Sequence, residues 1–131
     1  MNPKILMTVS SIMLGLIGIA ALFIPELFLN LFNAQPTNGL SVLIQLMGGL
    51  YFSLAMLNWA AKDSAIGGVY ARPVSLANFV HFMIGTFTLG KYQIAGNTNV
   101  FILIMLIMYA IFSILFWWLI FKYDALKKDS L

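Results

Sequence analysis

Residues 100–121 read VFILIMLIMYAIFSILFWWLIF, an apolar run that contains no charged side chain. A hydrocarbon layer of about 30 Å is crossed by about 20 such residues in an α-helix. Residues 4–24, 40–61 and 72–90 form three further runs that are mainly apolar. The sequence therefore predicts an all-α membrane protein, in which residues 1–131 form a single domain, a four-transmembrane-helix bundle.

The composition supports this fold class. Of the 131 residues, 62% are hydrophobic and 8% are charged, whereas soluble domains carry about 25% charged residues. A water-soluble fold cannot bury so much apolar surface. The absence of cysteine excludes disulfides, thiol redox chemistry and cysteine-based metal sites within the chain. The basic residues form no stripe with interleaved aromatic side chains, so we expect no nucleic acid as a partner.

The segment after the first span predicts a short helix at the outer membrane interface. Pro25 ends the first span, and residues 26–33 then place apolar side chains on one helical face and polar side chains on the other. The apolar face comprises Leu27, Phe28, Leu31 and Phe32, and the polar face comprises Glu26, Asn30 and Asn33. Residues 35–39, 62–72 and 91–99 are the predicted connections between spans.

The distribution of Lys and Arg predicts how the spans are oriented. Lys91 falls on one side of the membrane, and the other six of the seven basic residues fall on the opposite side. These six are Lys4, Lys62, Arg72, Lys122, Lys127 and Lys128. Because short loops rich in Lys and Arg stay in the cytoplasm, we expect both termini and the 62–72 connection to be cytoplasmic. The predicted location is a bacterial inner (plasma) membrane.

Polar side chains within the second and third spans form the candidate site, because an unpaired polar group in hydrocarbon is costly. On the second span, Tyr51 and Asn58 recur at helical spacing, and on the third span Asn78 and His81 lie three residues apart. The stripe on the second span also includes Gly48, Ala55 and Lys62, and the stripe on the third includes Val74 and Gly85.

A short connection makes these two spans antiparallel neighbours, and equal rise per residue then brings Tyr51 level with His81. The prediction is a hydrogen-bonded cluster of Tyr51, His81 and Asn78 near mid-membrane, with Asn58 and Arg72 closer to the cytoplasmic surface. One interpretation is that these groups hold two helices together, at about 0.6 kcal/mol per bond. The alternatives are that they orient a small or lipophilic ligand, or that His81 carries out chemistry.

The acidic residues argue against proton-coupled transport. Glu26, Asp63, Asp124 and Asp129 all lie at or outside the predicted membrane boundaries, so no carboxylate stands inside the membrane to carry a proton. No catalytic motif or phosphate loop is recognisable, and one histidine cannot form a metal site alone. We therefore expect no enzyme, no metal and no cofactor.

Several of these features together resemble small bacterial four-span proteins of unknown function, loosely grouped as DoxX-like. The features are a glycine-spaced first span that ends in Pro25-Glu26-Leu27-Phe28, then Gly48-Gly49-Leu50-Tyr51, then Arg72-Pro73 and a third span with Asn78 and His81. The arginine expected early in the first span of DoxX proper is absent. The resemblance implies four spans, but no mechanism and no functional residues.

Two functions remain open. Small residues in the first two spans, Gly15, Gly18, Gly48, Gly49 and Ser53, permit close approach between helices. They favour a non-enzymatic accessory or scaffold protein that packs with itself or with partner membrane proteins. The alternative is a bundle that binds or transports a lipophilic molecule or small solute through the polar face between the second and third spans. Besides the lipid bilayer, the expected partner is a second copy or another membrane protein.

Overall fold

The computed structural model describes residues 2–63, 71–97 and 99–128, with residue 71 and residues 122–128 described by their backbone alone. These residues form five α-helices and contain no strand. They divide into two units, Met1–Lys62 and Asp63–Leu131, each of which is described by itself. The prediction of an all-α chain is confirmed for the part of the chain that the structure describes.

Three of the described helices are long and apolar enough to cross a membrane. They are α1 (Pro3–Phe23), α3 (Asn38–Ala61) and the Val100–Phe121 part of α5 (Val100–Lys128). Their bounds almost coincide with the predicted first, second and fourth spans. The helix at the predicted third span, α4 (Ala71–Ile94), is as long as α3, but Asn78 and His81 in its interior lower its mean hydropathy.

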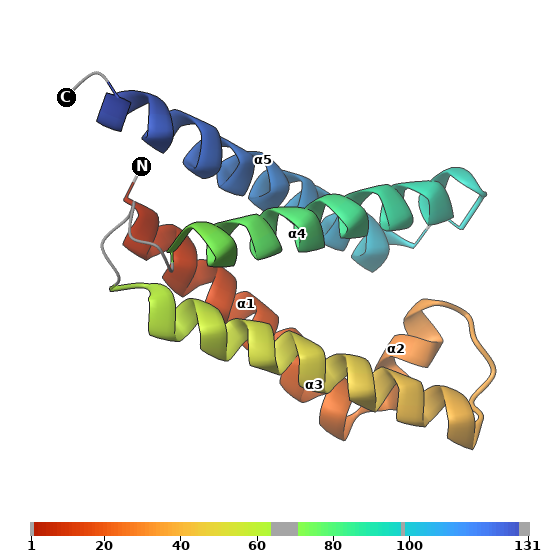
Figure 1. Cartoon of the computed structure of the whole chain (residues 1–131). Coiled ribbons are helices and arrows are strands. Elements are labelled where there is room, and N and C mark those ends of the chain that lie inside the picture. Colours follow the sequence, from red (N-terminus) through yellow and green to blue (C-terminus); the bar gives the residue numbers. More distant parts are fainter. Residues whose placement is uncertain (1, 64–70, 98, 129–131) are drawn as a thin grey trace. The chain divides into compact units, whose positions relative to one another are not determined.

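In the first unit, α1 and α3 run antiparallel, as Figure 1 shows, with the short α2 (Pro25–Leu31) between them in the chain. Each long helix begins at a capping side chain. Asn2 Oδ1 accepts a hydrogen bond from the Lys4 amide at the start of α1, and Thr37 Oγ1 accepts one from the Leu40 amide at the start of α3. The buried residues of α3 are Gly48, Ala55 and Asn58. The α3 side of the contact therefore consists of small and polar residues, whereas the buried residues of α1 also include Leu6, Met7 and Leu14.

The short helix α2 confirms the predicted helix after the first span. Pro25 stands in its first turn, where a backbone N–H is not needed. Three of the four residues of the predicted apolar face are half-buried and Leu27 is exposed, whereas all three residues of the predicted polar face are exposed. Leu29, which was assigned to neither face, is buried. The helix ends at Leu31, and the φ of 52° at Asn33 lets the Ala34 amide donate to the Leu29 carbonyl.

In the second unit, α4 and α5 form an antiparallel hairpin (Figure 1). Gly85 of α4 faces Tyr109 of α5, and Gly90 faces Leu106 nearer the connection. Phe82, farther from the connection, stacks on Phe112 and Phe116 of α5. The contact between the two helices therefore extends over several turns.

The α4 helix continues through Ile94, so the prediction that residues 91–99 form a connection is wrong in its first half. It stops there because Gly96 adopts a φ of 95°, a left-handed conformation that favours glycine, and its amide donates to the Gln93 carbonyl. The polar residues Lys91, Tyr92 and Gln93 suggested a loop, but they form the last turn of the helix.

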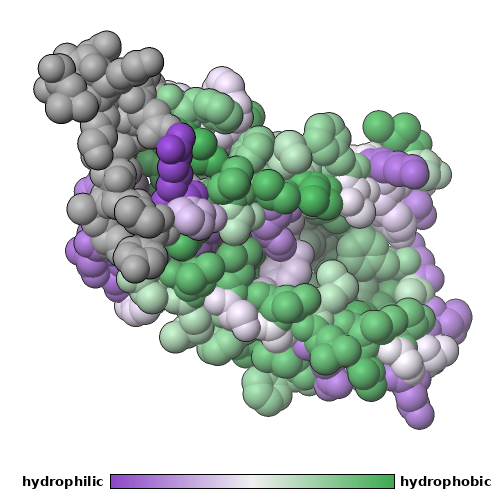
Figure 2. All heavy atoms as spheres, viewed as in Figure 1, coloured by the Kyte–Doolittle hydropathy of each residue, from purple (hydrophilic) through white to green (hydrophobic). Residues whose placement is uncertain are grey.

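Large apolar side chains cover most of the outward surface of the helices, and Figure 2 shows them over the face in view. Phe23, Leu50 and Phe87 expose 79, 71 and 71% of their surface. Soluble proteins rarely leave so many large apolar side chains together in contact with water. This surface is the one expected against lipid chains.

Candidate functional site

The buried polar groups of the first unit lie where α1 and α3 are in contact. Ser10 and Asn58 are fully buried, and Asn58 Nδ2 donates a hydrogen bond to Ser10 Oγ over 3.0 Å. Ser10 Oγ donates in turn to the Met7 carbonyl of its own helix. One residue along, Ser11 Oγ donates to the Ala55 carbonyl over 2.7 Å. Two side chains of α1 thus bond across to α3, and each bond satisfies a polar group that is shielded from solvent.

Farther along the same seam, the backbones of α1 and α3 approach each other directly. A Cβ atom at Gly18 would lie 2.7 Å from the Phe52 amide nitrogen and 2.9 Å from the Gly48 carbonyl oxygen. A Cβ atom at Gly48 would lie 2.9 Å from the Gly18 carbonyl oxygen and from the Leu22 amide nitrogen. Because these neighbours are backbone atoms, no side-chain rotation can make room. Only glycine fits at both positions.

The predicted stripe on the second span is confirmed as the buried face of α3 for Gly48, Ala55 and Asn58. The described partner of Asn58 in this contact is Ser10 of α1. Sequence reasoning missed Ser10 and Ser11, because two serines in a long apolar run look like ordinary helix residues that bond to their own backbone. The signal that could have found them is the pair of adjacent hydroxyl side chains in an otherwise apolar run.

Aromatic rings fill the contact between α4 and α5. Phe82 is fully buried, and its ring stacks on Phe112 and Phe116 with centroid distances of 4.9 and 5.8 Å. Tyr109 meets Phe82 edge-on at 5.2 Å and lies so close to Gly85 that a Cβ atom there would collide with the Tyr109 ring. Stacked and edge-on pairs contribute about 0.5–1.5 kcal/mol each beyond their buried area. We call these rings the aromatic cluster.

Of the predicted site residues, His81 and Asn78 lie beside this cluster. The His81 ring contacts the Phe82 and Tyr109 rings, with centroids 5.2 and 5.7 Å apart. Asn78 is fully buried, and its Nδ2 donates to the Val74 carbonyl over 2.8 Å. Sequence reasoning missed Tyr109. It is the only tyrosine of the 100–121 run, and that was the signal that could have found it.

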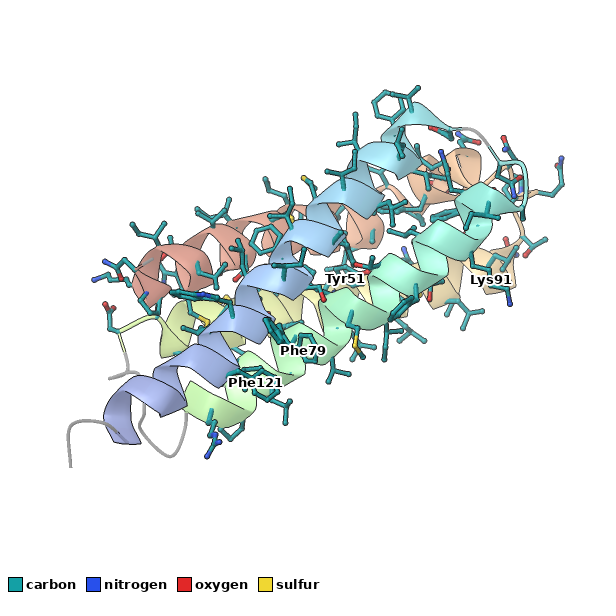
Figure 3. The ribbon with its side chains drawn as sticks, turned by 90° about the horizontal axis from the view of Figure 1, so that it is seen from above. Tyr51, Phe79, Lys91 and Phe121 are labelled. Carbon is teal, nitrogen blue, oxygen red and sulfur yellow. The ribbon has the colours of Figure 1, made fainter. Side chains whose placement is uncertain are left out.

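The remaining predicted site residues are Tyr51 and Arg72. Tyr51 is half-buried on α3, where Figure 3 labels it, and Arg72 is exposed in the first turn of α4. Tyr51 and Asn58 belong to the first unit, whereas Arg72, Asn78 and His81 belong to the second. The predicted cluster of Tyr51, His81 and Asn78 joins two units that are described separately, so it stays a prediction.

The Asn58 amide and the Ser11 hydroxyl donate hydrogen bonds that join α1 and α3. Ser10 and Asn78 donate to carbonyls of their own helices. Ser10 and Ser11 both donate their hydroxyl protons to main-chain carbonyls, an arrangement that fixes the side chains rather than activating them for attack on a substrate. Comparison of the chain with protein-family models, with curated protein sequences and with solved structures gave no significant match. The resemblance to DoxX-like proteins therefore stays a prediction.

Proposed function

We propose that the chain is an integral membrane protein with four spans, in which α4 crosses the membrane together with α5. The support is their packing. Gly85, Phe82 and Gly90 of α4 contact side chains of the apolar Val100–Phe121 part of α5. A helix of 24 residues is about 36 Å long, which suffices to cross with its neighbour. Asn78 and His81 are tolerable there because they lie on the side of α4 that contacts α5 and not against lipid.

In this proposal both termini and the 62–72 connection lie in the cytoplasm of a bacterial inner membrane. The support is the distribution of Lys and Arg along the sequence. The α2 helix then lies at the outer surface, where its exposed residue Leu27, with the neighbouring Phe23 and Ile24, enters the headgroup region.

We infer that the protein is a non-enzymatic accessory or scaffold protein, which packs with itself or with another membrane protein. The observation that carries this inference is the Ser10–Asn58 bond. The most deeply buried polar pair of the first hairpin holds its two helices together, and so does the Ser11–Ala55 bond beside it. The exposed surface of the helices is mainly apolar, which suits contact with lipid and with other transmembrane helices.

The test is purification of the full chain in a mild detergent, followed by native mass spectrometry. We expect a defined oligomer or a stoichiometric complex with another membrane protein. A monomer that retains one lipophilic molecule or small solute would contradict the scaffold function and favour the alternative, a bundle that binds or transports such a molecule.

A matched pair of variants makes this test specific. Asn58→Ala removes one of the two buried hydrogen bonds between α1 and α3 and should weaken the complex. Leu57→Ala changes the adjacent residue, of which 45% is exposed, and should leave the hairpin intact. If Leu57→Ala dissociates the complex and Asn58→Ala does not, the partner binds the outward face of α3 and does not depend on how the hairpin is held.

A further inference from the structure

We propose that the first hairpin binds the phosphate of an anionic phospholipid headgroup at the end where α1 begins and α3 ends, through Lys4 and Lys62 beside Trp59. This inference rests on the proposed membrane spans, because the spans place these side chains at the headgroup level. We call these three residues the basic end of the hairpin.

The register of the hairpin brings the two lysines to the same level. Ser11 bonds to Ala55 across the seam. Lys4 precedes Ser11 by seven residues, and Lys62 follows Ala55 by seven residues. Seven residues are about two helical turns, which return a side chain to nearly the same face. Because α1 and α3 are antiparallel, Lys4 and Lys62 therefore both stand at the end of the seam, one on each helix.

The contact between Lys62 and Trp59 fixes the height of one cation. Lys62 Nζ lies 3.0 Å above the centroid of the Trp59 ring, a cation–π contact. Trp59 exposes 46% of its surface. Indole rings of membrane proteins favour the headgroup region, so this contact holds the Lys62 ammonium group where lipid phosphates lie.

Charge favours an anionic lipid over a neutral one at this end. Among the described residues of the first unit, the charged side chains are Lys4, Glu26 and Lys62, and Asp63 follows Lys62 directly in the chain. Lys4, Lys62 and Asp63 stand at one end and leave it net positive, whereas Glu26 makes the other end negative. The indole face and the apolar stems of the lysines suit a headgroup with acyl chains better than an acidic peptide.

The test uses the fluorescence of Trp59 in vesicles. The chain has three tryptophans, so the variant Trp117→Phe/Trp118→Phe keeps Trp59 alone. It is reconstituted in phosphatidylcholine vesicles that contain an equal small fraction of either brominated phosphatidylglycerol or brominated phosphatidylcholine. We expect phosphatidylglycerol to be enriched at Trp59, and this preference to fall about fivefold for each lysine removed, in Lys4→Gln and Lys62→Gln.

The ratio of quenching by the two lipids within one variant cancels any change in the intrinsic fluorescence of Trp59. The control Lys91→Gln removes a lysine of the other unit and should leave the ratio unchanged. Equal quenching by both lipids, or a preference that survives Lys4→Gln/Lys62→Gln, would overturn the proposal. If neither lipid quenches Trp59, the hairpin is not in the bilayer, and the membrane spans fail together with the lipid site.

A second measurement covers the case in which the tryptophan variant does not fold. Native mass spectrometry of the unaltered chain, in detergent with equal amounts of the two unbrominated lipids, should show phosphatidylglycerol adducts in excess. The excess should disappear in Lys4→Gln/Lys62→Gln and remain in Lys91→Gln. Adducts in equal amounts would contradict the proposed site.

Discussion

The two hairpins of this protein are held together by different means. The α1–α3 contact is a seam with the backbones touching at Gly18 and Gly48 and hydrogen bonds at Ser10 and Ser11. The α4–α5 contact is filled by large rings around Phe82, and its glycine lies beneath a ring rather than against a backbone. The distance between α1 and α3 is therefore fixed by backbone contact, whereas the stability of the α4–α5 contact depends on the volume of its side chains.

The two hairpins should therefore respond differently to substitution. Within a membrane the hydrophobic effect does not drive helices together, so packing and hydrogen bonds decide their association. A seam with backbone contact tolerates no added atom, while an aromatic contact tolerates no lost ring. Substitutions that add volume should damage the first hairpin most, and substitutions that remove volume should damage the second.

The largest effect is expected from removing the ring at the centre of the aromatic cluster. Phe82→Ala leaves a cavity among Tyr109, Phe112 and Phe116, and should lower the free energy of unfolding by about 3–5 kcal/mol. The measurement is equilibrium unfolding in mixed micelles, followed by tryptophan fluorescence. Phe87→Ala is the control, because Phe87 lies on the same helix and is 71% exposed. Equal losses in the two variants would contradict a packed contact between α4 and α5.

A smaller effect is expected in α3, at one of two adjacent glycines and not at the other. Gly48→Val puts methyl groups into the backbone of α1 and should lower the free energy of unfolding by about 1–3 kcal/mol. Gly49→Val should change it little, because a Cβ atom at Gly49 meets nothing within 4 Å. The same unfolding measurement compares the two variants. A larger loss at Gly49 than at Gly48 would show that α1 and α3 do not meet at the described register.

The α1–α3 and α4–α5 contacts also show which features the sequence could predict and which it could not. Apolar runs and prolines were enough to place α1, α3 and the apolar part of α5, because length and hydropathy are properties of each segment alone. The periodicity of Gly48, Ala55 and Asn58 gave the buried face of α3. It could not name Ser10 as the partner of Asn58, because a face on one helix does not say which helix covers it.

The other differences between the predicted and the observed structure also have local causes. The last turn of α4 was missed because Lys91 and Gln93 are polar, although both are good helix formers, and Gly96 rather than their polarity ends the helix. Tyr109 was missed because a single tyrosine in an apolar run resembles the rings around it.

The hydrogen bond between Asn58 and Ser10 should give a measurable but modest coupling energy. Asn58→Ala and Ser10→Ala, made singly and together, form a double-mutant cycle. We expect a coupling energy of about 0.6–1.7 kcal/mol from the same unfolding measurement, the range found for polar pairs between membrane helices. Additive losses would mean that the Asn58–Ser10 bond does not contribute to stability.

The smallest effect is expected for the predicted hydrogen bond between Tyr51 of the first hairpin and His81 of the second. Tyr51→Phe and His81→Phe test whether these side chains bond to each other near mid-membrane. A coupling energy of about 0.6 kcal/mol between them would support the cluster of Tyr51, His81 and Asn78. No coupling would mean that the two hairpins use other faces, and that any ligand between them is not held by this pair.

The proposal of four spans is tested most directly by single cysteines, because the chain has none of its own. Gln35→Cys, Asp63→Cys and Ala95→Cys place exposed thiols in the connection before α3, after α3, and between α4 and α5. They are probed with a membrane-impermeant thiol reagent on intact spheroplasts and after permeabilisation.

If α4 crosses the membrane, Gln35→Cys and Ala95→Cys react in intact spheroplasts, and Asp63→Cys reacts only after permeabilisation. If only α1, α3 and α5 cross, Ala95→Cys lies on the same side as Asp63→Cys and is protected with it. Labelling of Ala95→Cys in intact spheroplasts, with protection of Asp63→Cys, is the result that the four-span account predicts. Protection of both would contradict it.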